Sequence, residues 1–492
     1  MNRVLPEEAG ISSKQIKAYI EKLERAGLAT HDMIIMRGDD VIFEAYWKPF
    51  TADFQHRLYS VSKSFIAIAI GFLLEEGKID LDDPMEKYFA KELQDQPDQN
   101  MHKQTVRHML MMATAKTPEN WHISGTEDRV QFYFSNPNKD SRPSGTIFRY
   151  DSPGSFVLGA LVERITGKPF MEYLNEKLFC KIGVSPDAYC LKCPGGHSWG
   201  DSAIIMRPMD LARVARFMLN GGKWNGEQIL SESFVKEATG KRIDNNTLGN
   251  YDYCKCGYGY LIWRTYEDSF FFNGMGCQFA ICVPHKDLVF VYNADNQGNG
   301  VAKNIIIDSF FEMIVDQAED APLPADPAAE KDLADLVSGL TLFTAKGDKK
   351  TSMTERVQDK TYVMNENDMG ITKFSLHFEG NGGVFRYTNA QGDKEIAFGM
   401  CENVYGKFPQ EGYSNMVGSV KTKNFYYDCA ASAAWVEEQK LFIKVQVIDT
   451  YFGNLSIIIH FKDNVCGVCM EKTAENFLNE YKGFGEGTLL EA

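Results

Sequence analysis

Hydrophobic and polar residues alternate near the start of the chain and then change period. Residues 32–47 hold two alternating apolar runs on either side of Gly38-Asp39-Asp40, a pattern typical of a β-hairpin. From Ser60 onward the apolar positions recur at helical spacing, and Gly77 lies where a glycine would end the helix. These helical positions are Phe65, Ile66, Ala69, Phe72 and Leu73. The pattern predicts a hairpin followed by a buried helix of about four turns.

Residues 80–240 read mostly as helices, and strand character returns after them. Helical spacing is clearest over 106–112, 156–165 and 210–219. The strand-like runs are Tyr258–Arg264, Ser269–Phe272, Gln278–Pro284 and Leu288–Ala294, followed by a helix-like run over 301–315. Strands at both ends with helices between them predict an α/β (α+β) domain over residues 1–319. Its antiparallel sheet is flanked by helices, with an all-helical insertion at about 80–240.

A second domain is expected after a proline-rich linker. Residues 320–329 carry three prolines and read as an extended connection. A short helix over 330–340 and several strand-like runs follow, separated by Gly, Asn and Asp. These runs are Phe374–Phe378, Val384–Tyr387, Leu441–Val447 and Leu455–Phe461. We therefore expect residues 330–492 to form a mostly antiparallel β domain resembling a small barrel.

Composition and charge narrow the range of partners. With 492 residues, 44% of them hydrophobic, the chain is long enough and apolar enough to bury a large core. The net charge of −15, without any run of five basic residues, disfavours nucleic acid as a partner. The longest apolar stretch, Phe65 to Leu74, is about half of what a bilayer crossing needs, so no membrane partner is expected.

Two further features indicate the compartment. The N-terminal residues lack the apolar core and the cleavage site of a secretory signal. The 11 cysteines are an odd number spread over a long chain, which suits reduced thiols better than a disulfide framework. The sequence therefore predicts a cytoplasmic protein.

A Ser-x-x-Lys pattern provides the first candidate for chemistry, and it occurs twice, at Ser60 to Lys63 and at Ser233 to Lys236. Ser60 begins the predicted buried helix, so Ser60 and Lys63 would share one helical face near its positive end. A lysine desolvated by apolar neighbours can take the proton of a serine hydroxyl. Ser233 lies in a polar stretch and is disfavoured. On spacing alone, a helix-capping Ser60 and a solvated Lys63 are equally good interpretations.

The second candidate is Tyr150-Asp151-Ser152, where a tyrosine ends an extended segment just before a Pro-Gly turn and a helix. A phenol at such a position can face a cleft. Similar Tyr-x-Asn patterns at Tyr387 and Tyr413 lie in the separate C-terminal domain and are discounted.

Taken together, YSVSKSF, TVRHMLMM, FRYDSPGSFVLGALVERITG and GDSAIIMRPMDLARVARFMLNGGKWNGEQIL resemble motifs of the serine β-lactamase/penicillin-recognising superfamily. The nearest branch is that of the class C β-lactamase-like esterases and amidohydrolases, over roughly residues 1 to 318. The resemblance implies an acyl-serine mechanism without a cofactor. Ser60 would be the nucleophile, Lys63 its partner base and Tyr150 the general base and acid. Ser152 would replace the usual Asn of the second motif.

The third motif of this family should fall between Phe270 and Ala280, and Met275-Gly276-Cys277-Gln278 aligns best. Its glycine would let substrate approach the strand closely, and the Gln278 and Ser60 N–H groups would form the oxyanion hole. Met275 replaces the usual polar residue, so Met275, Gly276, Cys277 and Ser152 would face a neutral substrate. A plain glycine-rich turn is the alternative interpretation.

Other motifs are weaker. Gly196-His197-Ser198-Trp199-Gly200 matches a nucleophile elbow but lacks the strand before it and the helix after it. The cysteine pairs match no compact zinc module, so no metal is expected. These pairs are Cys190/Cys193, Cys254/Cys256 and Cys466/Cys469.

The sequence therefore predicts a serine hydrolase that cleaves a small ester or amide through an acyl-enzyme on Ser60. A relative that binds ligand without turnover is one alternative, motivated by Ser152 and the weak third motif. A D-amino-acid peptidase or a β-lactamase-type amidase is another. A peptidase directed at the cell wall is disfavoured by the missing export signal, because its polymeric substrate lies outside the cell.

Overall fold

The computed structural model describes residues 1–119, 121, 126–135, 141–246, 251–413, 421–449, 451–474 and 480–490. The chain divides into two units between Thr341 and Leu342. Each unit has its own sheet and is described separately.

The first unit is built on a six-stranded antiparallel sheet in the order β2-β1-β11-β10-β9-β8. Its strands are β1 (Thr30–Arg37), β2 (Asp40–Tyr46), β8 (Trp263–Arg264), β9 (Phe270–Gly274), β10 (Gln278–Val283) and β11 (Leu288–Ala294). The first strand of the N-terminal hairpin pairs with the last strand of the unit, with Ile34 opposite Val291. This pairing confirms a sheet assembled from both ends of the region.

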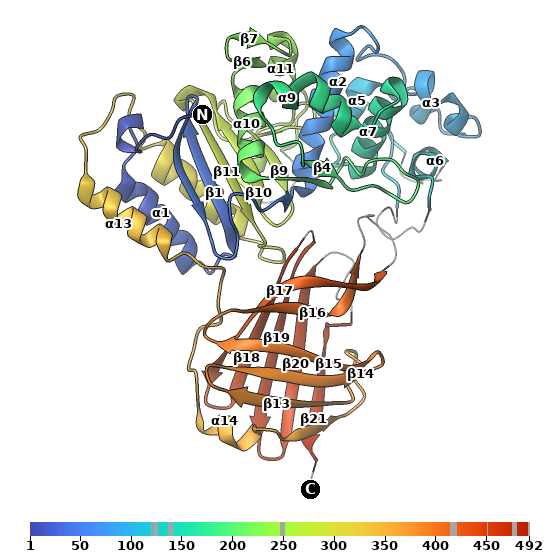
Figure 1. Cartoon of the computed structure of the whole chain (residues 1–492). Helices are drawn as coiled ribbons and strands as arrows, with labels where there is room; N and C mark the ends of the chain where they lie inside the picture. Colours follow the sequence, from blue (N-terminus) through green and yellow to red (C-terminus); the bar gives the residue numbers. More distant parts are fainter. Residues whose placement is uncertain are drawn as a thin grey trace. The chain divides into compact units, whose positions relative to one another are not determined.

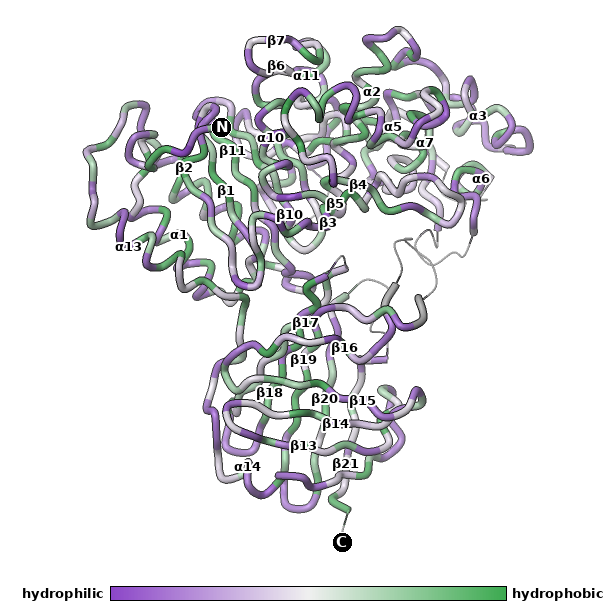
Figure 2. The backbone as a smooth tube through the Cα atoms, in the orientation of Figure 1, coloured by the Kyte–Doolittle hydropathy of each residue, from purple (hydrophilic) through white to green (hydrophobic). Residues whose placement is uncertain are grey.

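Hydrophobic side chains on both faces of the sheet explain its position at the centre of the unit. Helices α1 (Ser13–Arg25), α12 (Ala302–Phe310) and α13 (Pro327–Ser338) lie on one face, and their apolar residues share one core with Met33, Ile35 and Phe290. Helix α10 (Pro208–Leu219) packs on β1, β10 and β11. Figure 2 shows the hydrophobic character of β1 and β2 in green. A strand buried on both faces needs such a nearly continuous apolar run.

Between β2 and β8 the chain is mostly helical (Figure 1), but short strands also lie within residues 80–240, so the insertion is not all-helical as expected. Its helices are α2 (Ser62–Glu75), α3 (Glu86–Leu93), α4 (Gln99–His102), α5 (Val106–Leu110), α6 (Arg129–Ser135), α7 (Ser152–Thr166), α8 (Phe170–Leu174), α9 (Cys180–Ile182), α10 and α11 (Glu232–Thr239). Helix α2 is buried from Ser62 to Leu73, which confirms the prediction of a buried helix after Ser60. Two small sheets accompany the helices. They are β3 (His56–Arg57) with β5 (Ile204–Met206) and β4 (Tyr189–Cys190), and β6 (Lys223–Trp224) with β7 (Glu227–Gln228).

The helix expected to open the C-terminal domain belongs to the first unit instead. Proline 327 lies within the first turn of α13, where a helix accepts it, and the Asp326 side chain caps that turn. Leu333 and Leu340 are buried in the core beside the sheet, and α13 packs against α1. Residues 327–329 of the expected linker therefore belong to α13, because the apolar positions that follow them attach the helix to the preceding core.

The second unit is a β-barrel preceded by a short helix, α14 (Ser352–Val357). Its ten-stranded sheet has the order β15-β14-β13-β12-β21-β20-β19-β18-β17-β16, and an additional pairing of β15 with β17 brings its two ends together. The strands are β12 (Thr361–Met364), β13 (Lys373–Glu379), β14 (Gly382–Asn389), β15 (Gly392–Met400), β16 (Val404–Tyr413), β17 (Lys421–Glu437), β18 (Lys440–Ile448), β19 (Phe452–Lys462), β20 (Val465–Ala474) and β21 (Gly483–Leu489). The barrel-like domain expected from the alternating pattern is confirmed.

Candidate active site

Ser60 lies in a 3₁₀ turn that leads directly into α2. On one side of it, the Leu58 N–H donates to the Ile204 carbonyl at 2.9 Å. On the other, the Ile204 N–H donates to the Ser62 hydroxyl at 3.1 Å. The residues flanking Ser60 are therefore fixed to β5, while Ser60 itself stays partly exposed.

The turn before Ser60 is strained. Tyr59 has a φ of 48°, in the left-handed region that bulky residues rarely adopt. Such a conformation costs about 1–3 kcal/mol and persists only where the surroundings enforce it. Tyr59 is buried, and the Arg57 guanidinium lies 4.6 Å from its ring centroid. The strained turn places Ser60 at the corner between β3 and α2.

Lys63 lies one helical turn after Ser60 and faces it. Its Nζ donates to Ser60 Oγ at 3.0 Å and to the Asp201 main-chain oxygen at 2.6 Å. The residue is only 1% exposed, so the interpretation of Lys63 as a solvated surface cation is wrong. A buried amine in contact with a serine hydroxyl is the arrangement that lets a lysine take the serine proton.

The structure brings Tyr150 to the same place. The Lys63 Nζ lies 5.2 Å from the centroid of the Tyr150 ring. That ring stacks on Trp263 of β8, with centroids 5.8 Å apart and planes inclined by 28°. Trp263 in turn contacts the rings of Phe148 and Tyr258. An aromatic wall thus holds the phenol beside Lys63.

Ser152 follows as the first residue of α7. Its carbonyl accepts a hydrogen bond from the Ser155 hydroxyl at 2.7 Å. In the part of the chain that the structure describes, no hydrogen bond links the Ser152 side chain to Ser60, Lys63 or Tyr150. Asp151 caps the helix by accepting from the Gly154 N–H, and burial raises the pKa of Asp151 to about 6. The segment between Tyr150 and the helix therefore has a structural cap next to a candidate substrate contact.

The third motif lies at the turn between β9 and β10, next to the nucleophile segment. A Cβ atom on Gly274 would come within 2.5 Å of the Leu58 carbonyl oxygen, so only glycine allows this close approach. Gly276 continues the turn with a φ of 74°. The Gln278 side chain donates to the carbonyls of Ala294 and Met275, which fastens the turn to β11. This side chain is committed to holding the turn, which leaves only the main-chain N–H of Gln278 for an oxyanion hole.

The side chains of this turn point in different directions. Met275 is 39% exposed, whereas the Cys277 thiol is buried in the hydrophobic core and its pKa is raised to about 12 by burial. The expected role of Cys277 as a substrate-facing side chain is therefore corrected, since only its main chain can face a ligand. The physical reason is its positive φ of 75°, which turns the residue at the end of the hairpin.

Sequence reasoning missed two neighbours of the catalytic candidates. Asp201 is separated from Lys63 by 138 positions, and only the fold brings them together. Trp263, which supports the Tyr150 ring, lies in a very short edge strand. An acidic residue directly before an apolar strand is the one signal that could have drawn attention to Asp201.

The two competing serines occupy different surroundings. Ser233 and Lys236 are both exposed on α11, and the Ser233 hydroxyl donates to Ser231. Ser198 is buried in a bridge with Lys192, and its N–H donates to the Glu163 carboxylate at 3.3 Å. The strand β5 follows it, rather than the helix that a nucleophile elbow needs.

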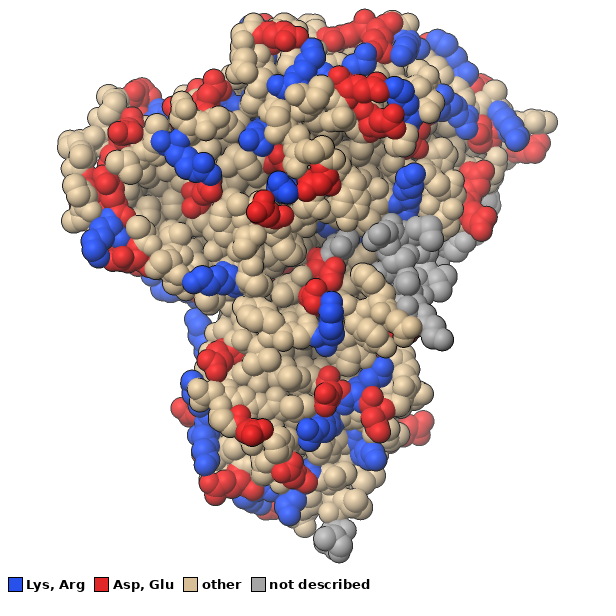
Figure 3. All heavy atoms as spheres, in the orientation of Figure 1, with Lys and Arg blue, Asp and Glu red and all other residues tan. Residues whose placement is uncertain are grey.

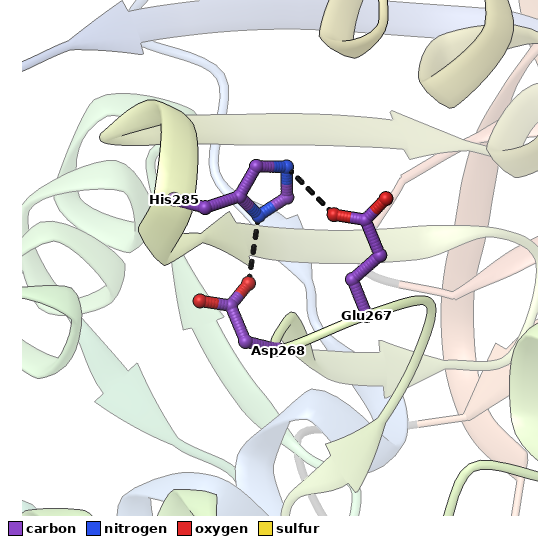
Figure 4. Close-up of side chains that lie close together, drawn as sticks. All are labelled: Glu267, Asp268 and His285. Carbon is purple, nitrogen blue, oxygen red and sulfur yellow. Dashed lines mark hydrogen bonds and ion pairs between the residues drawn. The ribbon is translucent and has the colours of Figure 1, made fainter.

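One cluster of metal-ligand side chains was also missed, and it lies at the end of the sheet away from the Met275 turn. Within the described ranges, Glu267, Asp268 and His285 are the residues whose ligand atoms come together (Figure 4), and none of the paired cysteines joins such a group. The His285 Nδ1 lies 2.7 Å from Asp268, and its Nε2 lies 2.9 Å from Glu267. The two carboxylates approach different edges of the ring and occupy both nitrogens. The cluster is explained as an exposed ion-paired link between two turns.

On the face shown in Figure 3, Lys and Arg side chains are interspersed with Asp and Glu. Among the described residues, no helix combines the length and the apolar character that a bilayer crossing requires.

Comparisons with known proteins place this site in a family context. Residues 13–306 match the family model described as Beta-lactamase. The matched range includes Ser60, Lys63, Tyr150 and the Met275 turn. A 6-aminohexanoate-dimer hydrolase of Paenarthrobacter ureafaciens is 28% identical over 221 residues, which cover 42% of this chain and 56% of that relative. The chain thus matches little more than half of that relative's length.

Two solved structures have similar folds. One is a Bacillus anthracis protein provisionally assigned as a 6-aminohexanoate-dimer hydrolase, with a TM-score of 0.51 and 20% identity over 64% of this chain and 87% of that chain. The other is the octameric penicillin-binding protein homologue of Pyrococcus abyssi, with a TM-score of 0.51 and 16% identity over 96% of this chain and 99% of that chain. At these identities the likeness concerns the fold.

Proposed function

Because the chain belongs to the beta-lactamase family, we propose that it is a serine hydrolase that cleaves a small amide or ester through an acyl-enzyme on Ser60. The observation that carries this proposal is the contact of 3.0 Å between the buried Lys63 Nζ and Ser60 Oγ. It joins a nucleophile and a base within hydrogen-bond reach, as covalent catalysis requires.

The proposed reaction proceeds in two halves. Ser60 Oγ attacks the substrate carbonyl while Lys63, with Tyr150, accepts the hydroxyl proton. The N–H groups of Ser60 and Gln278 stabilise the oxyanion, and the departing amine or alcohol receives the proton. Tyr150 then takes a proton from a water molecule as that water attacks the acyl-enzyme. The bond between the acyl carbon and Ser60 Oγ breaks, the proton passes from Tyr150 to Ser60 Oγ, and the acid is released. The close approach of Gly274 to Leu58 supports the placement of this oxyanion hole, because it brings β9 against the nucleophile segment.

The surroundings favour a neutral substrate. Ser152, Gly276 and the exposed Met275 would contact the substrate, beside the ring of Tyr150. Lys303 donates to Asn273 and to the Gly274 carbonyl next to this turn. Its cation is therefore engaged by the protein. A neutral amide or ester with aliphatic neighbours is our first choice of substrate class. The 6-aminohexanoate dimer that names the Paenarthrobacter relative shares the aliphatic amide, but in its open-chain form it also carries a charged amine and a carboxylate.

A substrate panel with matched serine variants tests this proposal. The panel holds p-nitrophenyl esters of several chain lengths, the linear 6-aminohexanoate dimer, a chromogenic cephalosporin and a D-amino-acid anilide. We expect the wild-type protein and Ser233→Ala to turn over at least one neutral compound equally well, and Ser60→Ala to lose that activity. Undiminished turnover by Ser60→Ala would contradict the proposal. Saturable binding without turnover of any compound would favour a non-catalytic relative.

We also propose that the protein works in the cytoplasm. No disulfide joins any two of the 11 cysteines, all of which lie among the described residues, and several of them are buried, as suits a reducing compartment. Cell fractionation with detection of the native protein tests this, and recovery from an oxidising compartment would contradict it.

A further inference from the structure

Asp201 contacts the candidate base from a loop that precedes β5. Its main-chain oxygen accepts from Lys63 Nζ at 2.6 Å, closer than the 3.0 Å between that nitrogen and Ser60 Oγ. Asp201 has no exposed surface. The residue that fixes the lysine therefore carries a carboxyl group into the same buried region.

Two hydrogen bonds, from the Asp201 main-chain N–H and from the Ser202 hydroxyl, only partly offset the burial of this carboxyl group. Its Oδ2 has no hydrogen-bond partner among the residues that the structure describes. The Ser202 hydroxyl reaches Oδ1 only at 3.5 Å, the outer limit of a hydrogen bond. A buried carboxylate in such a position needs nearby positive charge instead.

That charge comes from three elements around Asp201. Burial raises the pKa of Asp201 to about 6, and the cations of Lys63 on α2 and Arg57 on β3 act in the opposite direction. Arg129 on α6 also interacts with it electrostatically. The Cys190 thiol on β4 faces it as well, and burial keeps the pKa of that thiol well above its ordinary value. Asp201 is thus the anionic partner of a buried group of cations that includes the candidate base.

We propose that Asp201 is a positioning residue that acts through Lys63, balancing its cation and so setting the pH range over which Ser60 is nucleophilic. The inference rests on the proposed role of Ser60 and Lys63, and it adds a carboxylate that the serine mechanism does not otherwise use. The Asp201 main-chain oxygen orients the Lys63 amine, and the Asp201 carboxylate balances the positive charge of that amine.

The expected direction of the effect does not depend on which group takes the serine proton. A buried negative charge near Ser60 opposes the loss of the Ser60 proton, because it disfavours a second negative charge in the same region. Removing that charge therefore makes the loss of the Ser60 proton easier. The pH at which Ser60 becomes reactive should therefore move toward acid when Asp201 is neutralised.

The test is the rate at which a fluorophosphonate labels Ser60 between pH 5 and pH 9. For Asp201→Asn we expect the midpoint of the rate profile to move about one pH unit toward acid, which makes labelling about tenfold faster on the acid side. Asp210→Asn is the matched control, because Asp210 is also buried but pairs with Arg213 at 3.0 Å. Its profile should coincide with that of the wild type. A purely structural role of Asp201 would change the amount of active protein but leave the midpoint in place.

The outcomes separate this inference from the proposed function. A wild-type protein that is labelled at Ser60, with an Asp201→Asn midpoint equal to its own, would overturn the role of Asp201 alone. A wild-type protein that is not labelled at Ser60 would overturn both.

If Asp201→Asn does not fold, a comparison of the wild type with Lys63→Met tests the inference instead. The Asp201 carboxyl is then titrated by carbon-13 NMR in both proteins. Loss of the lysine cation should raise the midpoint of Asp201, because coupled groups shift each other reciprocally. Equal midpoints would overturn the inference.

Discussion

Ser60 to Lys63 and Ser233 to Lys236 have the same spacing, and both lie in helical turns of the first unit. In the first pair the lysine is buried and its Nζ contacts the serine hydroxyl at 3.0 Å. In the second pair both side chains are exposed, and the Ser233 hydroxyl donates to another serine at 3.4 Å. Equal spacing has therefore produced one site with reactive geometry and one ordinary surface turn.

The difference between the pairs comes from what surrounds them. The strained Tyr59 turn and two hydrogen bonds to Ile204 fix the first pair against β5. Asp201 and the Tyr150 ring then enclose its lysine. On α11, the exposed Ser233 hydroxyl donates to Ser231, and Lys236 is exposed as well. Burial and fixed partners, rather than spacing, make a Ser-x-x-Lys pattern competent for chemistry.

The largest difference between the pairs should follow from removing each lysine. Lys63→Met keeps an unbranched apolar side chain in the buried position, and we expect kcat/KM to fall by about 10³- to 10⁴-fold because the base is lost. Lys236→Met should leave kcat/KM unchanged. Steady-state kinetics on the best neutral substrate measure both, with thermal unfolding as the control for folding. Equal effects of the two substitutions would contradict the distinction.

Removing the phenol alone should have a somewhat smaller effect. Tyr150→Phe retains the ring that stacks on Trp263, so we expect a folded protein whose kcat/KM falls by about 10²- to 10³-fold. The matched control is Tyr189→Phe, an exposed tyrosine of the same unit. Full activity of Tyr150→Phe would show that the phenol carries no proton in the rate-limiting step.

The two Ser-x-x-Lys pairs also show which features of the fold could be predicted from the sequence. Alternation and helical spacing are local properties, and they located β11 at Leu288–Ala294 and the buried helix after Ser60. The expected strand over 258–264 is reduced to Trp263–Arg264, because Leu261 adopts a φ of 54° and Gly259 packs against the Ala238 carbonyl.

Contacts between distant segments were harder to predict. Resemblance to a family brought Tyr150 to the nucleophile, but neither resemblance nor periodicity indicated Asp201, which meets Lys63 only through the pairing of β3 with β5. The direction of the Cys277 side chain depends on one backbone angle at the end of a hairpin. Such features arise from tertiary structure and leave no periodic trace in the chain.

The apolar Met275 turn predicts which substrates the protein prefers. Without a lysine or arginine in residues 270–280, a substrate carboxylate lacks a charge-assisted hydrogen bond there. Such a bond is worth about ten- to a hundredfold in binding. We expect neutral short-chain esters to be cleaved well and a chromogenic cephalosporin to be hydrolysed poorly.

Met275→Lys should improve kcat/KM for the cephalosporin by about tenfold and leave the esters nearly unchanged. Met275→Leu is the matched control, which keeps the turn apolar. Cephalosporin turnover by the wild type that equals the best ester would contradict this account, and would indicate that a distant cation binds the carboxylate.

The smallest expected effect concerns stability. The pKa of Asp201 is about 6 in the folded protein against an ordinary value of 3.8. The stability that this group contributes is therefore present below pH 3.8 and is lost as pH rises through 6. Asp201→Asn has no ionisable group at this position, so this loss of stability is absent in the variant. We therefore expect its free energy of unfolding to exceed that of the wild type by about 1–3 kcal/mol at pH 7.5 and by less at pH 4.5. Denaturant unfolding at the two pH values measures this, and a difference that grows toward acid would contradict it.

The most direct test of the central claim is to identify the residue that carries a covalent adduct after treatment with a fluorophosphonate. Intact mass and peptide mapping are applied to the wild-type protein, to Ser60→Ala and to Ser233→Ala. We predict one adduct per chain on the peptide that contains Ser60, the same adduct in Ser233→Ala and none in Ser60→Ala. An adduct on a different serine of the wild type, or undiminished modification of Ser60→Ala, would contradict the account.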